Sequence, residues 1–242
     1  MQRSNQNSPT TSSNNLLAAP HHPPRGRIEL IIGPMFAGKS TELLRRIKRH
    51  EIAGSKCLRI KFAGDTRYSD DSIATHDQQT MRAIGARKLG DVASIGDEYD
   101  VIGIDEGQFF PDVIEYAEKL SNEGKVVIIS ALDGTFLRTG FENIINLIPK
   151  AEKVKKLAAI CKICNQNAYF TFRTCLSDQI QLIGGVEAYI PLCRECFNVE
   201  HLKQEEIKAR IQKKLSSEPT SHEKIPDNAS DSSSADESPE KC

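Results

Sequence analysis

One eight-residue segment, GPMFAGKS, constrains the fold of this 242-residue chain more than any other. It fits the pattern G-x-x-x-x-G-K-S and lies between a β-prone run at 28–32 and a helix-type run at 41–53, two flanks that argue against a chance match. In such a unit the glycines turn backbone N–H groups toward phosphate oxygens, the lysine bridges distal phosphates, and the serine hydroxyl suits Mg²⁺. The segment therefore predicts a nucleoside triphosphate site made by Gly33, Pro34, Met35, Phe36, Ala37, Gly38, Lys39 and Ser40.

Strands and helices are expected to alternate after this segment. The β-prone runs fall at 56–63, 101–104 and 125–130, and an amphipathic helix pattern at 113–120 precedes the last of them. Such alternation is typical of βαβ units and a mainly parallel sheet. We therefore expect an α/β fold with a P-loop NTPase-like parallel core, whose functional loops lie at the carboxyl ends of the strands.

An acidic pair, Asp105 and Glu106, follows the apolar run at 101–104. One carboxylate at this place can hold Mg²⁺, and its neighbour can take a proton from an attacking nucleophile. A solvated acidic pair at a strand end is the alternative. The pair also leaves open whether the nucleophile is water, as in an ATPase, or a substrate hydroxyl, as in a kinase.

Two C-x-x-C pairs are separated by 28 residues: Cys161 with Cys164, and Cys193 with Cys196. Four thiolates fill the tetrahedral shell of Zn²⁺ and leave no position for water, so the metal is expected to be structural. Redox pairs or unliganded thiols are the alternative. The spacing alone favours a β-hairpin between the pairs over a loop that closes on a ligand. The helix expected at 199–215 would turn Leu202, Ile207, Ile211 and Leu215 inward.

The ends of the chain differ in composition from its middle. Residues 1–26 and 216–242 are rich in polar residues and poor in large apolar ones, so we expect both to be disordered. Between them we expect a nucleotide-binding domain at 27–155 and a zinc-binding domain with a C-terminal helix at 156–215. No apolar run reaches the roughly 20 residues that a membrane helix needs, and a net charge of -1 argues against a nucleic-acid partner, so we expect a soluble intracellular protein.

Several motifs together resemble the cytosolic, zinc-containing (type II) thymidine kinase family. They are GPMFAGKSTELLRR, CLRIK with DTRYS, THD, VIGIDEGQFFPD, ALDGTF, the two C-x-x-C pairs and VEAY after IGG, in order over residues 27–197. The resemblance implies ATP-dependent phosphorylation of thymidine, and of deoxyuridine, to the monophosphate in deoxynucleotide salvage. It also implies a zinc-anchored lasso that closes on the base, a homotetramer, feedback inhibition by thymidine triphosphate (dTTP), and a cytoplasmic location.

The resemblance assigns roles residue by residue. Glu106 would be the general base for the 5′-hydroxyl, Ser40 and Asp105 would serve Mg²⁺, and the four cysteines would bind Zn²⁺. The glycine loop would bind ATP together with Asp65, Thr66, Arg67, Asp105, Glu106, Gly107 and Gln108. The nucleoside would contact Met35, Leu132, Phe136, Phe141, Thr171, Ile180, Gln181, Leu182, Ile183, Gly184 and Tyr189.

A P-loop ATPase that holds nucleic acid through its zinc module is the rival hypothesis. The basic run at 45–49 and the cysteine pairs motivate it. However, the interleaved aromatic residues and the large basic excess of a strand-binding surface are absent from the sequence. The absence of an N-K-x-D sequence argues against a GTPase.

Overall fold

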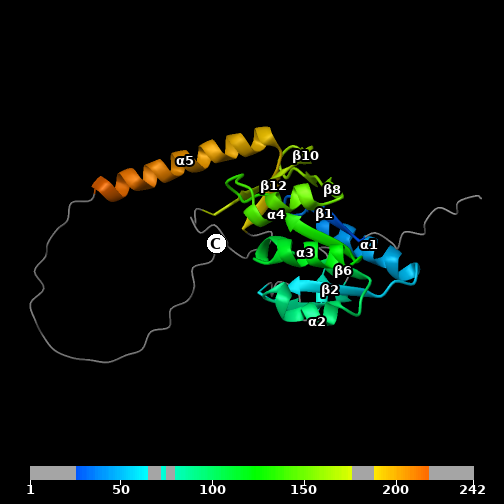
Figure 1. Ribbon diagram of the computed structural model, residues 1–242. Coiled ribbons are helices and arrows are strands. Elements are labelled where there is room, and N and C mark those ends of the chain that lie inside the picture. Colours follow the sequence, from blue (N-terminus) through cyan, green and yellow to red (C-terminus); the bar gives the residue numbers. More distant parts are fainter. Residues whose placement is uncertain (1–25, 65–71, 75–79, 176–187, 218–242) are drawn as a thin grey trace, which may run out of the picture.

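The computed structural model describes residues 26–64, 72–74, 80–175 and 188–217. Its centre is a six-stranded sheet with the order β5-β2-β6-β7-β1-β8, in which every pairing is parallel (Figure 1). The α/β fold with a parallel core is thus confirmed. The strands are β1 (Arg27–Gly33), β2 (Cys57–Phe62), β5 (Ile84–Ala86), β6 (Val101–Ile104), β7 (Val126–Leu132) and β8 (Lys153–Lys156). The four central strands were predicted from the sequence, whereas the two edge strands, β5 and β8, were not.

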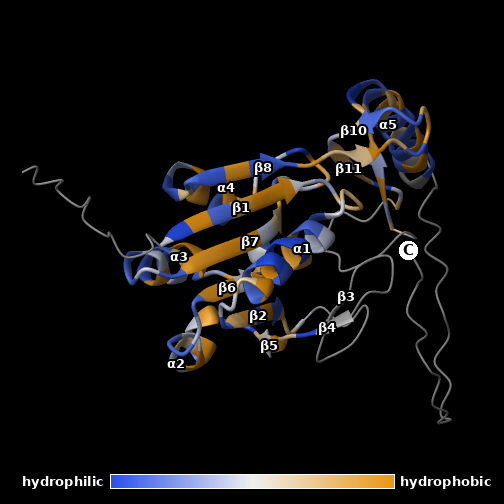
Figure 2. Cartoon of the chain, turned by 90° about the vertical axis from the view of Figure 1, so that its right-hand side faces the viewer, coloured by the Kyte–Doolittle hydropathy of each residue, from blue (hydrophilic) through white to orange (hydrophobic). Residues whose placement is uncertain are grey.

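Helices cover both faces of this sheet. Helix α1 (Lys39–Ile52) packs on one face, where Ile31 of β1 meets Leu43 and Ile47. Helices α3 (Val113–Asn122) and α4 (Glu142–Leu147) pack on the other face, where Leu30 of β1 belongs to the larger apolar cluster. Neighbouring residues of β1 therefore serve opposite faces, as the two-residue period of a strand requires. Figure 2 shows the hydrophobic colouring concentrated on the central strands between these helices.

Gly103 of β6 allows α1 to approach the sheet. A Cβ atom at this position would lie 2.2 Å from the Cδ1 atom of Ile47 on α1. The contact is therefore possible only because glycine has no side chain. It places α1, which begins at Lys39 in the glycine loop, against the strand that leads into Asp105.

A smaller module follows the sheet. It contains two antiparallel pairs, β9 (Ala159–Ile160) with β10 (Asn167–Ala168) and β11 (Phe170–Arg173) with β12 (Tyr189–Leu192), and it leads into α5 (Arg194–Ser217). Its own apolar cluster includes Phe172, Leu192 and Phe197, and Ala37 of the glycine loop packs against it. The module is thus attached to the sheet at the glycine loop.

Helix α5 differs from the helix expected at 199–215. It begins five residues earlier, at Arg194, and Leu202, Ile207 and Ile211 are exposed rather than inward-facing. Ile207 and Ile211 lie in the C-terminal half of α5, which extends away from the sheet (Figure 1). Leu202 is two residues from Gln204, whose amide bonds to Arg173, so it lies on the opposite side of the helix from that contact. The side chain of Leu215 lies outside the described residues.

The remaining elements are short. They are β3 (Ser72–Ala74), β4 (Thr80–Arg82), α2 (Ala93–Gly96) and the 3₁₀ turns Leu89–Val92, Gly107–Phe109 and Ile148–Lys150. Among the described helices, none is both long enough and apolar enough to span a bilayer. The segments expected to be disordered lie outside the described residues, except that Gly26 is described and the first two residues of the expected tail, Ser216 and Ser217, end α5.

Candidate active site

The glycine loop connects β1 to α1 at the carboxyl edge of the sheet. Gly33 has a φ of 148° and Gly38 a φ of 75°, and Phe36 also adopts a left-handed conformation, with a φ of 65°. A Cβ atom at Gly33 would lie 2.6 Å from the carbonyl oxygen of Leu157, so both the backbone angle and the space require glycine here. The Nζ atom of Lys39 donates a hydrogen bond of 2.8 Å to the carbonyl oxygen of Pro34. Its ammonium group is therefore folded back onto the loop.

The glycine loop is also bonded to the smaller module. The backbone N–H of Met35 donates to the hydroxyl oxygen of Thr171 on β11, at 3.0 Å. These two residues are 136 positions apart and were both predicted to contact the nucleoside. The structure therefore brings part of the predicted nucleoside site next to the predicted phosphate site.

The Asp105 carboxylate is buried where β6 ends. Its Oδ1 atom accepts a hydrogen bond of 3.1 Å from the Ser40 hydroxyl of the glycine loop, and the Ser130 hydroxyl donates to the same oxygen. Burial and the adjacent Glu106 charge raise the pKa of Asp105 to about 6, although the two hydroxyls and the Lys39 charge act in the opposite direction. A hydroxyl and a carboxylate oxygen side by side are donors that Mg²⁺ prefers, so this pair fits the metal predicted here.

A network of hydrogen bonds fixes the Glu106 carboxylate. The Glu106 backbone has a φ of 55°, which is uncommon for a residue other than glycine. The side-chain amide of Gln108 donates to the Oε2 atom of Glu106 at 2.6 Å, while its oxygen accepts from the backbone N–H of Leu132 at 3.0 Å. The amide of Asn143 donates to the carbonyl oxygen of Gln108 at 3.1 Å. Glu106 is therefore held in one orientation beside Asp105.

The other predicted nucleoside residues within the described part of the chain lie around the same edge. Leu132 ends β7, Phe136 lies in the following loop, Phe141 immediately precedes α4, and Tyr189 begins β12. The structure links Phe136 to Tyr189 through Arg173, whose guanidinium carbon lies 3.8 Å from the Phe136 ring centre and 5.2 Å from that of Tyr189. The predicted residues Asp65, Thr66, Arg67, Ile180, Gln181, Leu182, Ile183 and Gly184 lie outside the described residues.

Three residues of this region were missed by sequence reasoning. Ser130 is a polar residue at the end of a buried apolar run on the strand beside β6, and that position was a usable signal. Asn143 and Arg173 carried no comparable signal, because their partners are distant in the sequence.

The four cysteines of the C-x-x-C pairs converge. Their sulfur atoms all lie within 4.8 Å of one another, and those of Cys164 and Cys193 are 3.6 Å apart. Cys161 follows β9, and the second pair lies at the junction of β12 and α5. Four thiols in one cluster fit a structural Zn²⁺, and they join the two ends of the module.

The fold and the site together define the class of protein. It is a parallel α/β protein with a loop of the phosphate-binding type, two acidic residues at the carboxyl edge of the sheet, and a four-cysteine module attached to that loop.

Comparison with known proteins then identifies the family. Residues 26–197 match the family model "Thymidine kinase", and this chain belongs to that family. It is 52% identical over 177 residues to thymidine kinase 1 of Dictyostelium discoideum, which covers 72% of this chain and 78% of that protein. It is 53% identical over 173 residues to "Thymidine kinase, cytosolic" of Cricetulus griseus, covering 72% and 74%, and 51% identical over 172 residues to the thymidine kinase of Variola virus, covering 71% and 97%.

Proposed function

We propose that this protein transfers the γ-phosphoryl group of ATP to the 5′-hydroxyl of thymidine, with Glu106 as the general base. Membership of the thymidine kinase family supports the reaction. The observation that carries the assignment of the base is the Gln108–Glu106 hydrogen bond, which aims one carboxylate while Asp105 and Ser40 are engaged with each other beside it. The two adjacent acids thus have different surroundings and, in this proposal, different tasks.

The chemistry requires a proton acceptor and a set of positive charges. A nucleoside hydroxyl is a weak nucleophile near neutral pH, so the Glu106 carboxylate takes its proton as the bond to phosphorus forms. Lys39 and the backbone N–H groups of the loop from Gly33 bind the phosphates and offset charge on the moving phosphoryl group. Mg²⁺, when bound through Asp105 and Ser40, supplies further neutralisation.

The smaller module supports the second substrate. Its Thr171 and Tyr189 lie on the antiparallel pair β11–β12, and the cysteine cluster closes the ends of the segment that contains them. We propose that Zn²⁺ holds this segment in place as a lasso over the base, which excludes water and so limits ATP hydrolysis. The two expected domains, 27–155 and 156–215, correspond in this proposal to the phosphoryl-transfer and base-binding parts.

The rival function, a nucleic-acid-dependent ATPase, is not favoured by the family match.

We also propose a homotetramer inhibited by dTTP and located in the cytoplasm. The resemblance to the family supports the first two properties, and the name of the hamster relative supports the third. Size-exclusion chromatography coupled to light scattering and inhibition assays test the first two, and fluorescence microscopy of a tagged chain tests the third.

The test is the conversion of labelled thymidine to its monophosphate with Mg·ATP. We expect the wild-type protein to form the product, and Glu106→Gln to lower kcat by on the order of 10²- to 10⁴-fold, because only the proton acceptor is removed. Thymidine affinity, measured by calorimetry, should change little. Glu115→Gln, an exposed change on α3, is the matched control and should be neutral.

Two results would contradict the proposal. A kcat near the wild-type value in Glu106→Gln would remove Glu106 from the role of base. ATP turnover that needs DNA and forms no thymidine monophosphate would favour the rival function.

A further inference from the structure

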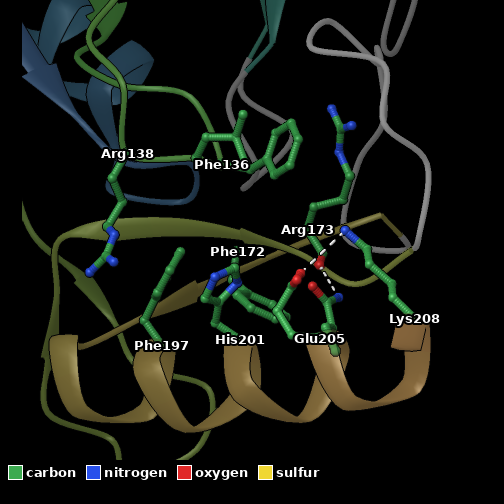
Figure 3. Close-up of a pocket in the computed structure, with 10 residues that line it drawn as sticks. Phe136, Arg138, Phe172, Arg173, Phe197, His201, Glu205 and Lys208 are labelled. Atoms are coloured by element: carbon green, nitrogen blue, oxygen red, sulfur yellow. Dashed lines mark hydrogen bonds and ion pairs between the residues drawn. The ribbon is translucent and has the colours of Figure 1, made fainter. Parts of the chain in front are cut away.

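Arg173 is a buried cation between two residues of the predicted base site. It ends β11, and only 2% of its surface is exposed. Its guanidinium carbon lies 3.8 Å from the centre of the Phe136 ring, and its Nη2 atom donates a hydrogen bond of 2.6 Å to the Tyr189 hydroxyl. Figure 3 shows the side chains of Arg173 and Phe136 side by side above α5.

The two partners of Arg173 come from different parts of the fold. Phe136 lies in the loop that follows β7 of the main sheet, whereas Tyr189 belongs to β12 of the smaller module and pairs with Arg173 across the strands. The planar guanidinium therefore links an aromatic ring beside the main sheet to an aromatic ring of the smaller module. A guanidinium can do this because it stacks on a ring face through its plane and donates hydrogen bonds from its edge.

The backbone of Arg173 is fixed as well. The side-chain amide of Gln204 on α5 donates a hydrogen bond of 2.8 Å to the carbonyl oxygen of Arg173. Helix α5 thereby holds the end of β11, so both the backbone of Arg173 and the tip of its side chain have hydrogen-bond partners.

We propose that Arg173 is a positioning residue that holds Phe136 and Tyr189 in the arrangement that receives the nucleoside base. The inference rests on the proposed function, in which these two residues contact thymidine. Without the guanidinium the two aromatic side chains relax separately, and the base meets a site that must be ordered at the expense of binding. The phosphoryl-transfer groups keep their geometry, so the loss falls on the KM for thymidine and spares kcat.

The experiment compares Arg173→Met and Arg173→Lys with the wild-type protein. Methionine keeps the length of the side chain but removes the charge and the donors, whereas lysine keeps the charge but loses the plane and the fork. We expect both variants to raise the thymidine KM about tenfold or more, with kcat within about threefold of wild type and the KM for ATP unchanged. Calorimetry should show the same loss of thymidine affinity.

Arg138→Met is the matched control. Arg138 also lies over aromatic rings in this region, 4.5 Å from the Phe197 ring centre and 5.7 Å from that of Phe170, but it is exposed and its two rings are not predicted base-site residues. Its removal should leave the thymidine KM unchanged. Zinc content and Tm are measured for each variant, so that a folding defect is recognised.

Tyr189→Phe provides a variant in which the buried charge is untouched. If Arg173 acts through Tyr189, Arg173→Lys should raise the thymidine KM by a smaller factor in a Tyr189→Phe background than in the wild type, because the Arg173–Tyr189 hydrogen bond is already absent there. An unchanged thymidine KM in both Arg173→Lys and Tyr189→Phe, with a lowered Tm, would overturn the proposal and leave Arg173 a purely structural role. This comparison decides the matter even if Arg173→Met does not fold.

Phe136→Ala separates this inference from the proposed function. If Phe136→Ala raises the thymidine KM and the Arg173 variants do not, the inference is wrong and the function stands. If the wild-type protein forms no thymidine monophosphate, the function fails and the inference fails with it.

Discussion

Asp105→Asn should stabilise the substrate-free protein while abolishing its Mg²⁺-dependent activity. The Asp105 carboxyl is buried beside Glu106, and its pKa is raised from 3.8 to about 6. Between these two values the folded chain holds a proton that the unfolded chain has lost, so this group destabilises the fold increasingly as the pH rises. Asparagine has nearly the same shape and can still accept hydrogen bonds from Ser40 and Ser130, but it carries no charge.

The magnitude follows from the shift in pKa. The full difference in pKa corresponds to about 3 kcal/mol of destabilisation of the fold above pH 7, of which only about 1 kcal/mol is present at pH 4.5. The gain in stability of Asp105→Asn over wild type should therefore grow by about 2 kcal/mol between pH 4.5 and pH 7.5. For a domain of this size, that corresponds to an increase in the Tm difference of about 4–8 °C.

The assay is thermal or urea unfolding across this pH range, without Mg²⁺ or nucleotide. Titrations of groups distant from Asp105, including those of the cysteine cluster, are common to both proteins and cancel in the difference. Asp97→Asn, an exposed change, is the control and should show no such growth. A difference between Asp105→Asn and wild type that is constant with pH, or that shrinks as the pH rises, would refute the reasoning.

Two further predictions concern the cysteine cluster and the buried ion pairs. Cys196→Ser should lower the zinc content measured by mass spectrometry and abolish thymidine binding while ATP binding persists. Cys57→Ser, a change outside the cluster, is the control and should retain the metal. Retained zinc in Cys196→Ser would exclude the assigned ligand set. Arg46→Met should lower the free energy of unfolding, measured in urea, by about 3 kcal/mol, because it removes a buried cation at 2.8 Å from the Glu29 carboxylate. The exposed Arg45→Met is the control and should lower it by about 1 kcal/mol or less. Equal losses in the two variants would contradict this account.

The sequence predicted the parts of this protein that depend on neighbouring residues. The glycine loop, the central strands and α1 follow from patterns a few residues long, and so does the recognition of each cysteine pair. Element ends shifted by only one or two residues in the sheet, because a strand or helix ends where its own apolar period stops. The two edge strands, β5 and β8, were missed: Lys153–Lys156 is almost wholly charged, and its strand conformation comes from pairing with β1.

The helix predicted at 199–215 is present within α5, but the prediction that its apolar residues face inward was wrong for a related reason. Leu202, Ile207 and Ile211 are apolar, and apolar residues in a helix usually indicate a buried face. Burial, however, requires an element to pack against, and the path of α5 away from the sheet provides none for Ile207 and Ile211, while Leu202 lies on the side opposite the contact with β11. A local pattern cannot reveal where a helix points.

By itself the sequence determined which chemistry this protein carries, because the glycine loop, the adjacent acids and the paired thiols are each recognisable from short spacings. Only the tertiary structure decided which side chains contact one another. It buried Asp105 between two hydroxyls, turned Glu106 toward Gln108, and placed Arg173 between Phe136 and Tyr189. These contacts join residues from different strands and loops, and their energies depend on burial and geometry that exist only once the sheet and the smaller module have packed together.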